Sequence, residues 1–340
     1  MLNRYPARRD PTARRAPGTG MTMRNGKIIA VIIPCYNVEQ TVADVVRRIP
    51  EEVDHLIAVD DASVDGTRRI LTGIPDNRLV VLTHDQNQGV GGAMATGFER
   101  AMGLNADIAV KIDGDGQMDP SLIPELINPL LDGSCDYVKG NRFLHTRELR
   151  QMPLSRKIGN ILLTFFTKFA SGYWHVFDPQ NGFLAIHRDF MAALDLGRLR
   201  NARYFCENEL LIQLNVMVAR VQDYPMPAHY NDAPSSLRVR SVILPFAFRL
   251  IRGFLFRSYH RYVLRDFSVI VPLYLLGAPL FLFGIIFGSY KWWYYATQAQ
   301  QPAPTGTIML AVLPLILGFQ MVIQALLIDI LQSPKPDRRR

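Results

Sequence analysis

The chain has 340 residues, of which 49% are hydrophobic and 20% are charged, and its mean hydropathy is +0.06. These values exclude an intrinsically disordered or fibrous protein and fit a soluble domain with a small membrane part. The formal net charge of +8 comes from the segments 1–27 and 238–265, each with seven Lys and Arg, whereas residues 28–237 are net acidic. Because the basic residues lie beside apolar segments, they indicate contact with anionic lipid headgroups and argue against a nucleic-acid-binding domain.

Residues 1–26 are rich in Arg, Pro, Thr and Gly and contain no apolar run. They predict a disordered basic arm and do not resemble a signal peptide, which needs an apolar core. The three cysteines, Cys35, Cys135 and Cys206, lie far apart and show no CxxC spacing. This pattern excludes a disulfide framework or a zinc ribbon and suits a reducing compartment.

From residue 27 onward, short apolar runs alternate with helical segments. The pattern predicts buried strands over 28–34, 56–59, 79–82 and 108–112, with helices over 40–48, 66–71 and 92–102. We therefore expect an α/β catalytic domain over 27–237, built on a mostly parallel, Rossmann-like sheet flanked by helices. Ligands of such sheets bind beyond the carboxyl ends of the strands.

The C-terminal third predicts a membrane-bound region. Arginines interrupt the apolar sequence of 238–266, which indicates amphipathic basic helices in the membrane surface. Residues 267–332 hold two apolar stretches, each long enough to span a bilayer, around an aromatic connector, and 333–340 form a basic tail. The arginine flanks place both ends, and thus the catalytic domain, in the cytoplasm and favour a hairpin over two buried core helices. Residues 158–170 fit an interfacial helix and an ordinary helix packed on the sheet equally well.

The most informative motif follows the predicted strand 108–112. It presents the carboxylates of Asp113 and Asp115 and the amide of Gln117 in the sequence DGDGQ. Oxygen ligands at a strand end suit Mg²⁺ or Mn²⁺, and paired buried carboxylates repel one another unless a cation lies between them. We therefore expect a divalent cation at this position.

Three further motifs follow the other predicted strands. They are IPCYN at 33–37, VDDASVDGT at 59–67 and NQGVGGA at 87–93. An acid after a strand can bind a ribose hydroxyl or a base N–H, and glycines let a backbone approach a sugar nucleotide. The glycine pattern lacks the third glycine of a dinucleotide fingerprint and follows the third strand, which argues against hydride transfer.

In this order, the four motifs resemble those of the family-2 glycosyltransferases of GT-A fold. Further segments, GNRF at 140–143, DPQNGF at 178–183, ENEL at 207–210 and SSLR at 235–238, are similar to the polyprenyl-phosphate branch, which includes dolichyl-phosphate mannose synthase and bacterial undecaprenyl-phosphate glucosyltransferases. The resemblance covers about residues 28–265.

The resemblance implies a role for each matching position. The nucleotide sugar, of UDP or GDP type, would contact Pro34, Tyr36, Asn37, Glu39, Asp61, Asp65, Gly89, Gly91 and Asp113. The metal would be held by Asp115 and Gln117 with Asp113, and Asp113, Asp115 and Arg142 would be catalytic. The phosphates of donor and lipid would meet Arg142, Arg156 and Arg238, and the acceptor side would comprise Gln180, Asn181, Gly182, Glu207 and Glu209.

The implied reaction transfers a sugar with inversion to a polyprenyl phosphate of undecaprenyl or dolichyl type. Such an acceptor needs no strong base, because a phosphate monoester is largely dianionic near pH 7. A glycan or lipid hydroxyl as acceptor would need a base, for which Glu207 and Glu209 are the candidates, unless they cap a helix or pair with Arg203. A degenerate, non-enzymatic membrane module is a third reading, which the intact Asp113, Asp115 and Gln117 oppose. Two spans and a surface helix also invite homo-oligomerisation.

Overall fold

The computed structural model describes residues 26–142, 154–227 and 239–337. The chain forms two compact units, one of Met1–Phe254 with Pro334–Arg340 and the other of Leu255–Ser333. Most of the predicted basic arm, the phosphate-binding candidate Arg238 and the last three arginines lie outside the described residues.

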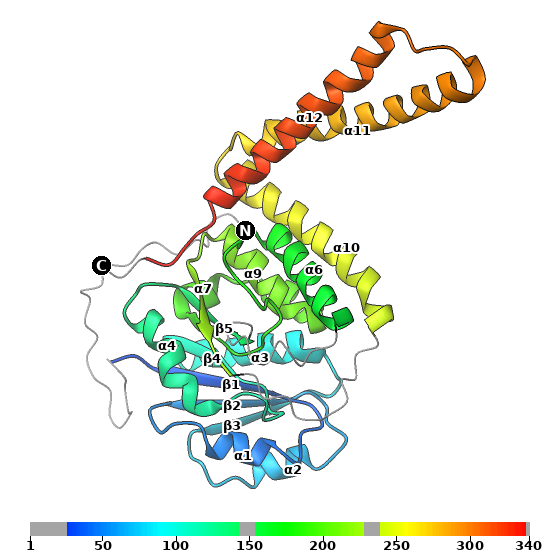
Figure 1. Ribbon diagram of the computed structural model, residues 1–340. Helices are drawn as coiled ribbons and strands as arrows, with labels where there is room; N and C mark the ends of the chain where they lie inside the picture. Colours follow the sequence, from blue (N-terminus) through cyan, green and yellow to red (C-terminus); the bar gives the residue numbers. More distant parts are fainter. Residues whose placement is uncertain (1–25, 143–153, 228–238, 338–340) are drawn as a thin grey trace. The chain divides into compact units, whose positions relative to one another are not determined.

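A seven-stranded sheet forms the centre of the first unit (Figure 1). Its strands run in the order β3-β2-β1-β4-β6-β5-β7, and β6 is antiparallel to its neighbours β4 and β5 while the other pairs are parallel. The predicted mostly parallel α/β sheet is thus confirmed. The strands are β1 (Ile29–Cys35), β2 (His55–Asp60), β3 (Leu79–Thr83), β4 (Ile108–Lys111), β5 (Tyr137–Asn141), β6 (Leu184–His187) and β7 (Val221–Pro225).

Helices cover both faces of this sheet. Val31 and Ile33 of β1 belong to the hydrophobic core beneath α1, α2 and α4, whereas Ile32 faces α3, whose Gly97 it contacts closely. Alternate side chains of one strand therefore serve two cores, which is why β1 is apolar throughout. The helices of this unit are α1 (Val42–Arg47), α2 (Thr67–Thr72), α3 (Gly89–Gly103), α4 (Ile123–Leu131), α6 (Leu154–Ser171), α7 (Arg188–Ala193), α8 (Leu196–Ala202), α9 (Cys206–Val216) and most of α10 (Val239–Ser258), with short 3₁₀ turns at Pro120–Leu122 and Arg203–Phe205.

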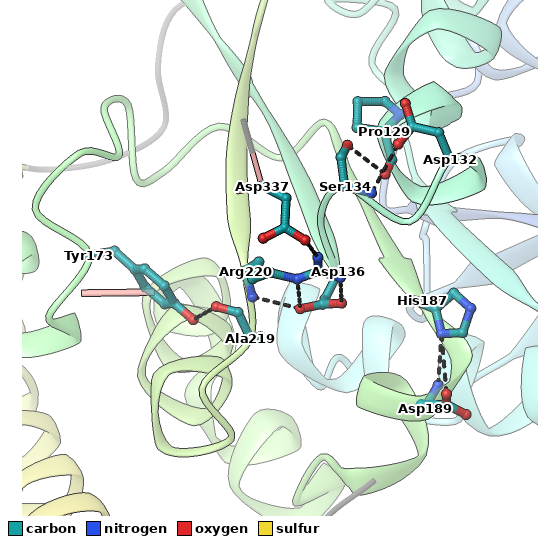
Figure 2. Close-up of polar contacts among 10 residues, drawn as sticks. All are labelled: Pro129, Asp132, Ser134, Asp136, Tyr173, His187, Asp189, Ala219, Arg220 and Asp337. Carbon is teal, nitrogen blue, oxygen red and sulfur yellow. Dashed lines mark hydrogen bonds and ion pairs between the residues drawn. The ribbon is translucent and has the colours of Figure 1, made fainter. Parts of the chain in front are cut away.

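The amino edge of the sheet, where the parallel strands begin, is closed by acids that accept neighbouring backbone N–H groups. Asp54, just before β2, accepts from Ile29 N at 2.8 Å, and Asp136, just before β5, accepts from Arg220 N at 2.8 Å. The Arg220 guanidinium also bonds both Asp136 oxygens, at 3.1 Å and 2.8 Å, and pairs with Asp337 of the C-terminal tail, as Figure 2 shows. This pairing fastens the described end of the chain to the sheet domain.

Helix α6 packs on the sheet domain and also carries an exposed apolar face. Its Thr167 hydroxyl bonds the Asn208 side chain of α9 at 3.2 Å, and Phe169 stacks on Phe254 of α10. At the same time Ile161 and Phe166 are 67% and 52% exposed. The structure thus shows a face of this helix that packs within the protein, whereas its place at a membrane interface stays a prediction.

The second unit contains a helical hairpin of α11 (Ile270–Tyr294) and α12 (Thr305–Leu331), with irregular helical turns at Tyr259–Arg265 and Tyr295–Ala299. Gly318 of α12 has no room for a side chain, since a Cβ there would lie 2.3 Å from Phe281 N. Small residues at helix crossings are typical of membrane hairpins. The segments Ile270–Ala299 and Thr305–Leu331 contain 18-residue stretches with mean hydropathies of 2.3 and 2.2, which make them candidate membrane spans by length and composition.

Beside the hairpin, a buried ion pair joins Arg257 to Asp329. The two guanidinium nitrogens lie 2.7 Å and 3.1 Å from the two carboxylate oxygens, and the Tyr262 hydroxyl bonds the same carboxylate. One of the arginines predicted to meet lipid headgroups is therefore used inside the protein.

Candidate active site

The loops that follow β1 and β2 are bonded to each other. Asn37, with φ of 54°, donates its N–H to the Ser63 hydroxyl at 3.0 Å and accepts from Val64 N at 3.0 Å. Pro34 is buried at the end of the strand, while Tyr36 is 48% exposed. These residues, predicted to contact the nucleotide, therefore form one wall at the carboxyl edge of the sheet.

A reciprocal pair of bonds joins Glu39 to the loop after β2. The Glu39 N–H donates to Asp65 at 3.1 Å, and the Glu39 carboxylate accepts from Gly66 N at 2.7 Å. Slight burial opposes ionisation of Asp65, but hydrogen bonds from Thr67 and from Glu39 N outweigh it and hold the pKa of this carboxyl below its usual value. Glu39 and Asp65 thus fix the shape of the predicted nucleotide wall.

Asp61 organises the start of α3. Its buried carboxylate accepts from Gln88 N at 2.8 Å and Gly89 N at 2.7 Å and lies 2.7 Å from His84 Nδ1. A carboxylate at a helix N-terminus accepts hydrogen bonds from the free N–H groups of the helix and interacts favourably with the helix dipole. In this structure both oxygens of Asp61 are occupied by the protein, so its contact with a base or ribose stays a prediction.

The two predicted glycines of the loop differ in what they do. Gly89 adopts φ of 77°, which favours glycine. Gly91 lies inside α3, and a Cβ there would be 2.3 Å from Leu199 O of α8. Its lack of a side chain is therefore explained by helix packing within the protein, and its nucleotide contact remains a prediction.

The loop after β4 carries the acids predicted to hold the metal. It is anchored by the Thr41 hydroxyl, which donates to Gly114 O at 2.7 Å. Asp115 accepts from Gln117 N at 3.0 Å. Burial and the nearby charge of Asp113 raise the pKa of Asp115, so a cation beside these groups would favour its ionised form.

One side of Asp113 is already paired within the protein. Its Oδ1 lies 3.0 Å from Nζ of Lys111, the last residue of β4, and the same Nζ lies 2.9 Å from Glu207 Oε1. Burial opposes ionisation of Glu207, but the charge and hydrogen bond of Lys111 prevail and lower its pKa. Lys111 was not predicted as a site residue, although it is a single lysine in an apolar strand, two residues before Asp113.

The second candidate base, Glu209, is also paired. It accepts from Arg198 Nε at 2.6 Å and from Gln213 Nε2 at 3.1 Å. The alternative prediction that these glutamates pair with Arg203 is wrong, since the Arg203 guanidinium donates to the Asn87 side chain at 3.2 Å.

Arg142 extends from the end of β5 and is held by Asp178. Its Nε and Nη2 lie 2.7 Å and 2.9 Å from the two carboxylate oxygens of Asp178, which has φ of 51°. Although burial disfavours its charge, the Arg142 hydrogen bonds keep the pKa of Asp178 below its usual value. Lys139, a second fully buried lysine, donates to the backbone carbonyls of Asp178 and Asn181.

The predicted acceptor segment 180–182 lies against both groups. Gln180 is exposed and Asn181 is buried, with its side chain bonded to Asp178 at 3.3 Å. A Cβ on Gly182 would lie 2.4 Å from both Asp113 Oδ2 and Lys111 Nζ. Arg156 lies in α6, without a described side chain, so no contact places it at this site.

The donor set fits a hard divalent cation bound together with a ligand. Among the described residues no group of three or more His, Cys, Asp or Glu side chains could hold a metal alone. Asp113, Asp115 and Gln117 can each offer an oxygen ligand, and Mg²⁺ in particular is commonly bound by one or two carboxylates and completed by substrate phosphates. The site thus suits a cation that arrives with a diphosphate.

Comparison with known proteins assigns the family. The model of "Glycosyl transferase family 2" matches residues 30–194. A UDP-N-acetylglucosamine–dolichyl-phosphate N-acetylglucosaminyltransferase of Methanococcus voltae is 34% identical over 65% of this chain and 92% of its own length. The chain belongs to glycosyltransferase family 2. This membership and the homologues show that it is a glycosyltransferase and confirm the resemblance found in its motifs.

Other relatives share the type of acceptor in their names. The polyprenol monophosphomannose synthase of Mycolicibacterium smegmatis is 26% identical over 60% of this chain and 77% of its own length.

Among solved structures, a Mycobacterium tuberculosis glucosyl-3-phosphoglycerate synthase with Mn²⁺, UDP-glucose and glycerol 3-phosphate aligns with this chain. The identity is 22% and the TM-score 0.49, over 72% of this chain and 86% of that one.

Proposed function

We propose that this glycosyltransferase moves a sugar from a nucleoside-diphosphate donor to a polyprenyl phosphate, with inversion and with the help of Mg²⁺ or Mn²⁺. The observation that carries the choice of acceptor is that both candidate bases are in ion pairs, Glu207 with Lys111 and Glu209 with Arg198. A hydroxyl acceptor needs a base, whereas a phosphate monoester is largely dianionic near pH 7. The similarity to the dolichyl-phosphate transferase of M. voltae supports the same acceptor.

The donor side of the proposed site lies at the ends of β1, β2 and β4. The nucleotide is bound along the wall formed by Pro34, Tyr36, Asn37, Glu39, Asp61 and Asp65, with Gly89 and Gly91 at the start of α3. Asp113 lies beside the sugar diphosphate. Asp115, Gln117 and Asp113 would hold a divalent cation, whose positive charge would stabilise the leaving diphosphate.

The acceptor side lies around Arg142. A guanidinium presents two parallel N–H groups to a phosphate, and Asp178 fixes the plane of this one through two bonds of 2.7 Å and 2.9 Å. Arg156 and Arg238 add further positive charge for the phosphates of donor and lipid, and Gln180, Asn181 and Gly182 form the adjacent wall. The phosphate oxygen of the acceptor attacks the anomeric carbon from the side opposite the nucleoside diphosphate, whose bond to that carbon breaks. The protein does not have to remove a proton from the acceptor in this step.

A membrane location of this activity, with the catalytic domain on the cytoplasmic face, follows from the two candidate spans and the positive-inside rule. The exposed apolar side chains Ile161, Phe166 and Phe248 on α6 and α10 would enter the lipid interface. There a lipid phosphate lies at headgroup depth while its isoprenoid chain stays in the bilayer.

The deciding experiment incubates membranes holding the protein with Mg²⁺ or Mn²⁺, one labelled UDP- or GDP-sugar at a time, and undecaprenyl or dolichyl phosphate. We expect organic-phase label with one donor, abolished by EDTA and restored by the metal. Release of the label by mild acid identifies a sugar phosphate, whereas acid-stable label means a hydroxyl acceptor. No label with any donor and either lipid contradicts the proposal, and membranes lacking the protein are the control.

A further inference from the structure

Lys111 is one of the largest fully buried side chains of the protein, at 1% exposure. Along β4, Val110 belongs to the core under α1 and α4, so Lys111 projects to the opposite face of the sheet, where α9 lies. It is the last residue of the strand, two positions before Asp113. Its ammonium group is therefore delivered by a rigid element to the base of the active site.

Two carboxylates share this ammonium group. Nζ lies 3.0 Å from Asp113 Oδ1 and 2.9 Å from Glu207 Oε1. Glu207 stands in the first turn of α9, so the lysine links a loop that follows β4 to a separate helix. A buried charge is tolerated only when it is paired and hydrogen-bonded, which both carboxylates provide here.

The chain closes over this group at Gly182, the residue two positions before β6. A Cβ at Gly182 would lie 2.4 Å from Lys111 Nζ and 2.4 Å from Asp113 Oδ2. One oxygen of the Asp113 carboxylate is thus paired with Lys111, and the other lies against the backbone at Gly182. Its orientation is set by Lys111 on one side and by the glycine on the other.

We propose that Lys111 is a positioning residue for the transfer reaction, which aims Asp113 at the metal-bound diphosphate and is itself held by Glu207. The inference rests on the proposed function, since it assumes that Asp113 meets the donor. It assigns Glu207 to the support of Lys111 rather than to proton abstraction. Without the lysine, Asp113 and Glu207 would face each other as like charges and Asp113 would turn away.

The test combines kinetics with a measurement that needs no turnover. We expect Lys111→Met to lower kcat about 100-fold, as a misplacement of about 1 Å can, with KM for polyprenyl phosphate changed less than about threefold. We also expect it to weaken binding of Mn²⁺ with UDP or GDP, followed by calorimetry and by the electron paramagnetic resonance signal of Mn²⁺. Arg220→Met, which breaks an ion pair at the amino edge, is the control and should leave both readouts unchanged.

A double-mutant cycle separates positioning from a purely structural role. If Lys111 acts through Asp113, adding Lys111→Met to Asp113→Asn should change Mn²⁺–nucleotide binding less than about twofold, because the two residues form one unit. Equal losses in both backgrounds overturn the proposal, as does a Lys111→Met enzyme with the kcat of the wild type.

Glu207→Gln keeps the test decisive if Lys111→Met does not fold. It retains an acceptor for Lys111, so we expect kcat to fall less than about tenfold, whereas loss of a general base costs about 10²–10⁴-fold. A fall in the latter range contradicts the inference. The wild-type donor panel judges the proposed function separately, and the metal–nucleotide binding cycle does not depend on which lipid is the acceptor.

Discussion

The two edges of the central sheet are built on opposite plans. At the amino edge, Asp54 and Asp136 accept backbone N–H groups of neighbouring strands, and Arg220 is bonded on both sides by Asp136 and Asp337 (Figure 2). Among the described residues of this edge, Asp54 thus has a backbone donor, and Asp136 and Arg220 pair with each other. This edge closes the fold and leaves little capacity for a ligand.

At the carboxyl edge the charges are less balanced. Lys111 faces both Asp113 and Glu207. Burial and the charge of Asp113 raise the pKa of Asp115, and the charge of Lys111 offsets this only in part. Excess negative charge is tolerated where a cation and a substrate complete the site. The comparison predicts that changes at the carboxyl edge reduce activity, whereas changes at the amino edge reduce stability.

The largest effect is expected from Asp115→Ala. Loss of the metal ligand should lower the rate of transfer by at least about 10²–10³-fold, as removal of a main source of charge stabilisation does. Organic-phase label in the membrane assay measures the rate, and sedimentation with membranes should be unchanged. Asp119→Ala, on the same loop but paired with Arg48 at 2.7 Å, is the matched control. An active Asp115→Ala enzyme would refute the metal assignment.

Arg142→Lys should have the next largest effect. Lysine keeps the charge but cannot make the two parallel bonds to Asp178 or to a phosphate. We expect kcat/KM for the lipid acceptor to fall about 10- to 100-fold, in line with the loss of about 1.5–3 kcal/mol for a hydrogen bond to a charged group. Steady-state kinetics with varied lipid measure it, and unchanged values would place the acceptor phosphate elsewhere.

Gly182→Ala tests how tightly the carboxyl edge is packed. The new methyl group would meet Asp113 and Lys111 at 2.4 Å, so both side chains must move or the backbone at 182 must shift. We expect about a tenfold loss of kcat and a destabilisation of about 1–3 kcal/mol, typical of overpacking. Gly103→Ala, where nothing lies within 4 Å, should be neutral in both kinetics and thermal unfolding. Equal behaviour of the two variants would show that the site relaxes freely.

Arg220→Met probes the other edge. Loss of its bonds to Asp136, 16% exposed, should lower the free energy of unfolding by about 1–3 kcal/mol, while kcat stays within about twofold of the wild type. Denaturant unfolding and the transfer assay measure the two quantities on the same preparation. A loss of activity without a loss of stability would reverse the comparison between the edges.

Local patterns in the sequence predicted much of this arrangement. The apolar run 28–34 became β1 (Ile29–Cys35), and the polar motifs after β1, β2 and β4 all lie at the carboxyl edge, because parallel strands end on the same side. A predicted boundary differs from the observed one where a distant side chain caps the helix. The helix predicted to begin at 92 begins at Gly89, whose N–H donates to Asp61.

Contacts between distant segments were not predictable in the same way. Nothing local shows that Lys111 meets Glu207, 96 residues later in the sequence, or that Arg257 meets Asp329. Strands β5, β6 and β7 were also missed, and the four residues of β6 carry no period that distinguishes its direction. Such features depend on the folded topology, whereas strand patterns depend on neighbouring residues.

A last effect, on stability alone, concerns Asp223 of β7, whose carboxylate accepts from Asn141 Nδ2. Burial raises its pKa to about 6, and the hydrogen bond from Phe177 N and the charge of Lys139 offset this only in part. The folded state therefore binds a proton that the unfolded state, with a pKa of about 3.9, releases. Stability from this group is fully present below about pH 4 and is lost as the pH rises through 6.

Asp223→Asn removes this titration. Relative to the wild type, the variant should become more stable by about 2 kcal/mol as the pH rises from 4 to 7, because only the wild type acquires a buried charge. Urea unfolding at several pH values measures the difference, with the exposed Asp85→Asn as control. A difference that stays flat with pH would mean that Asp223 remains charged in the folded protein. In that case Lys139 would balance Asp223 as fully as Arg220 balances Asp136 at the amino edge.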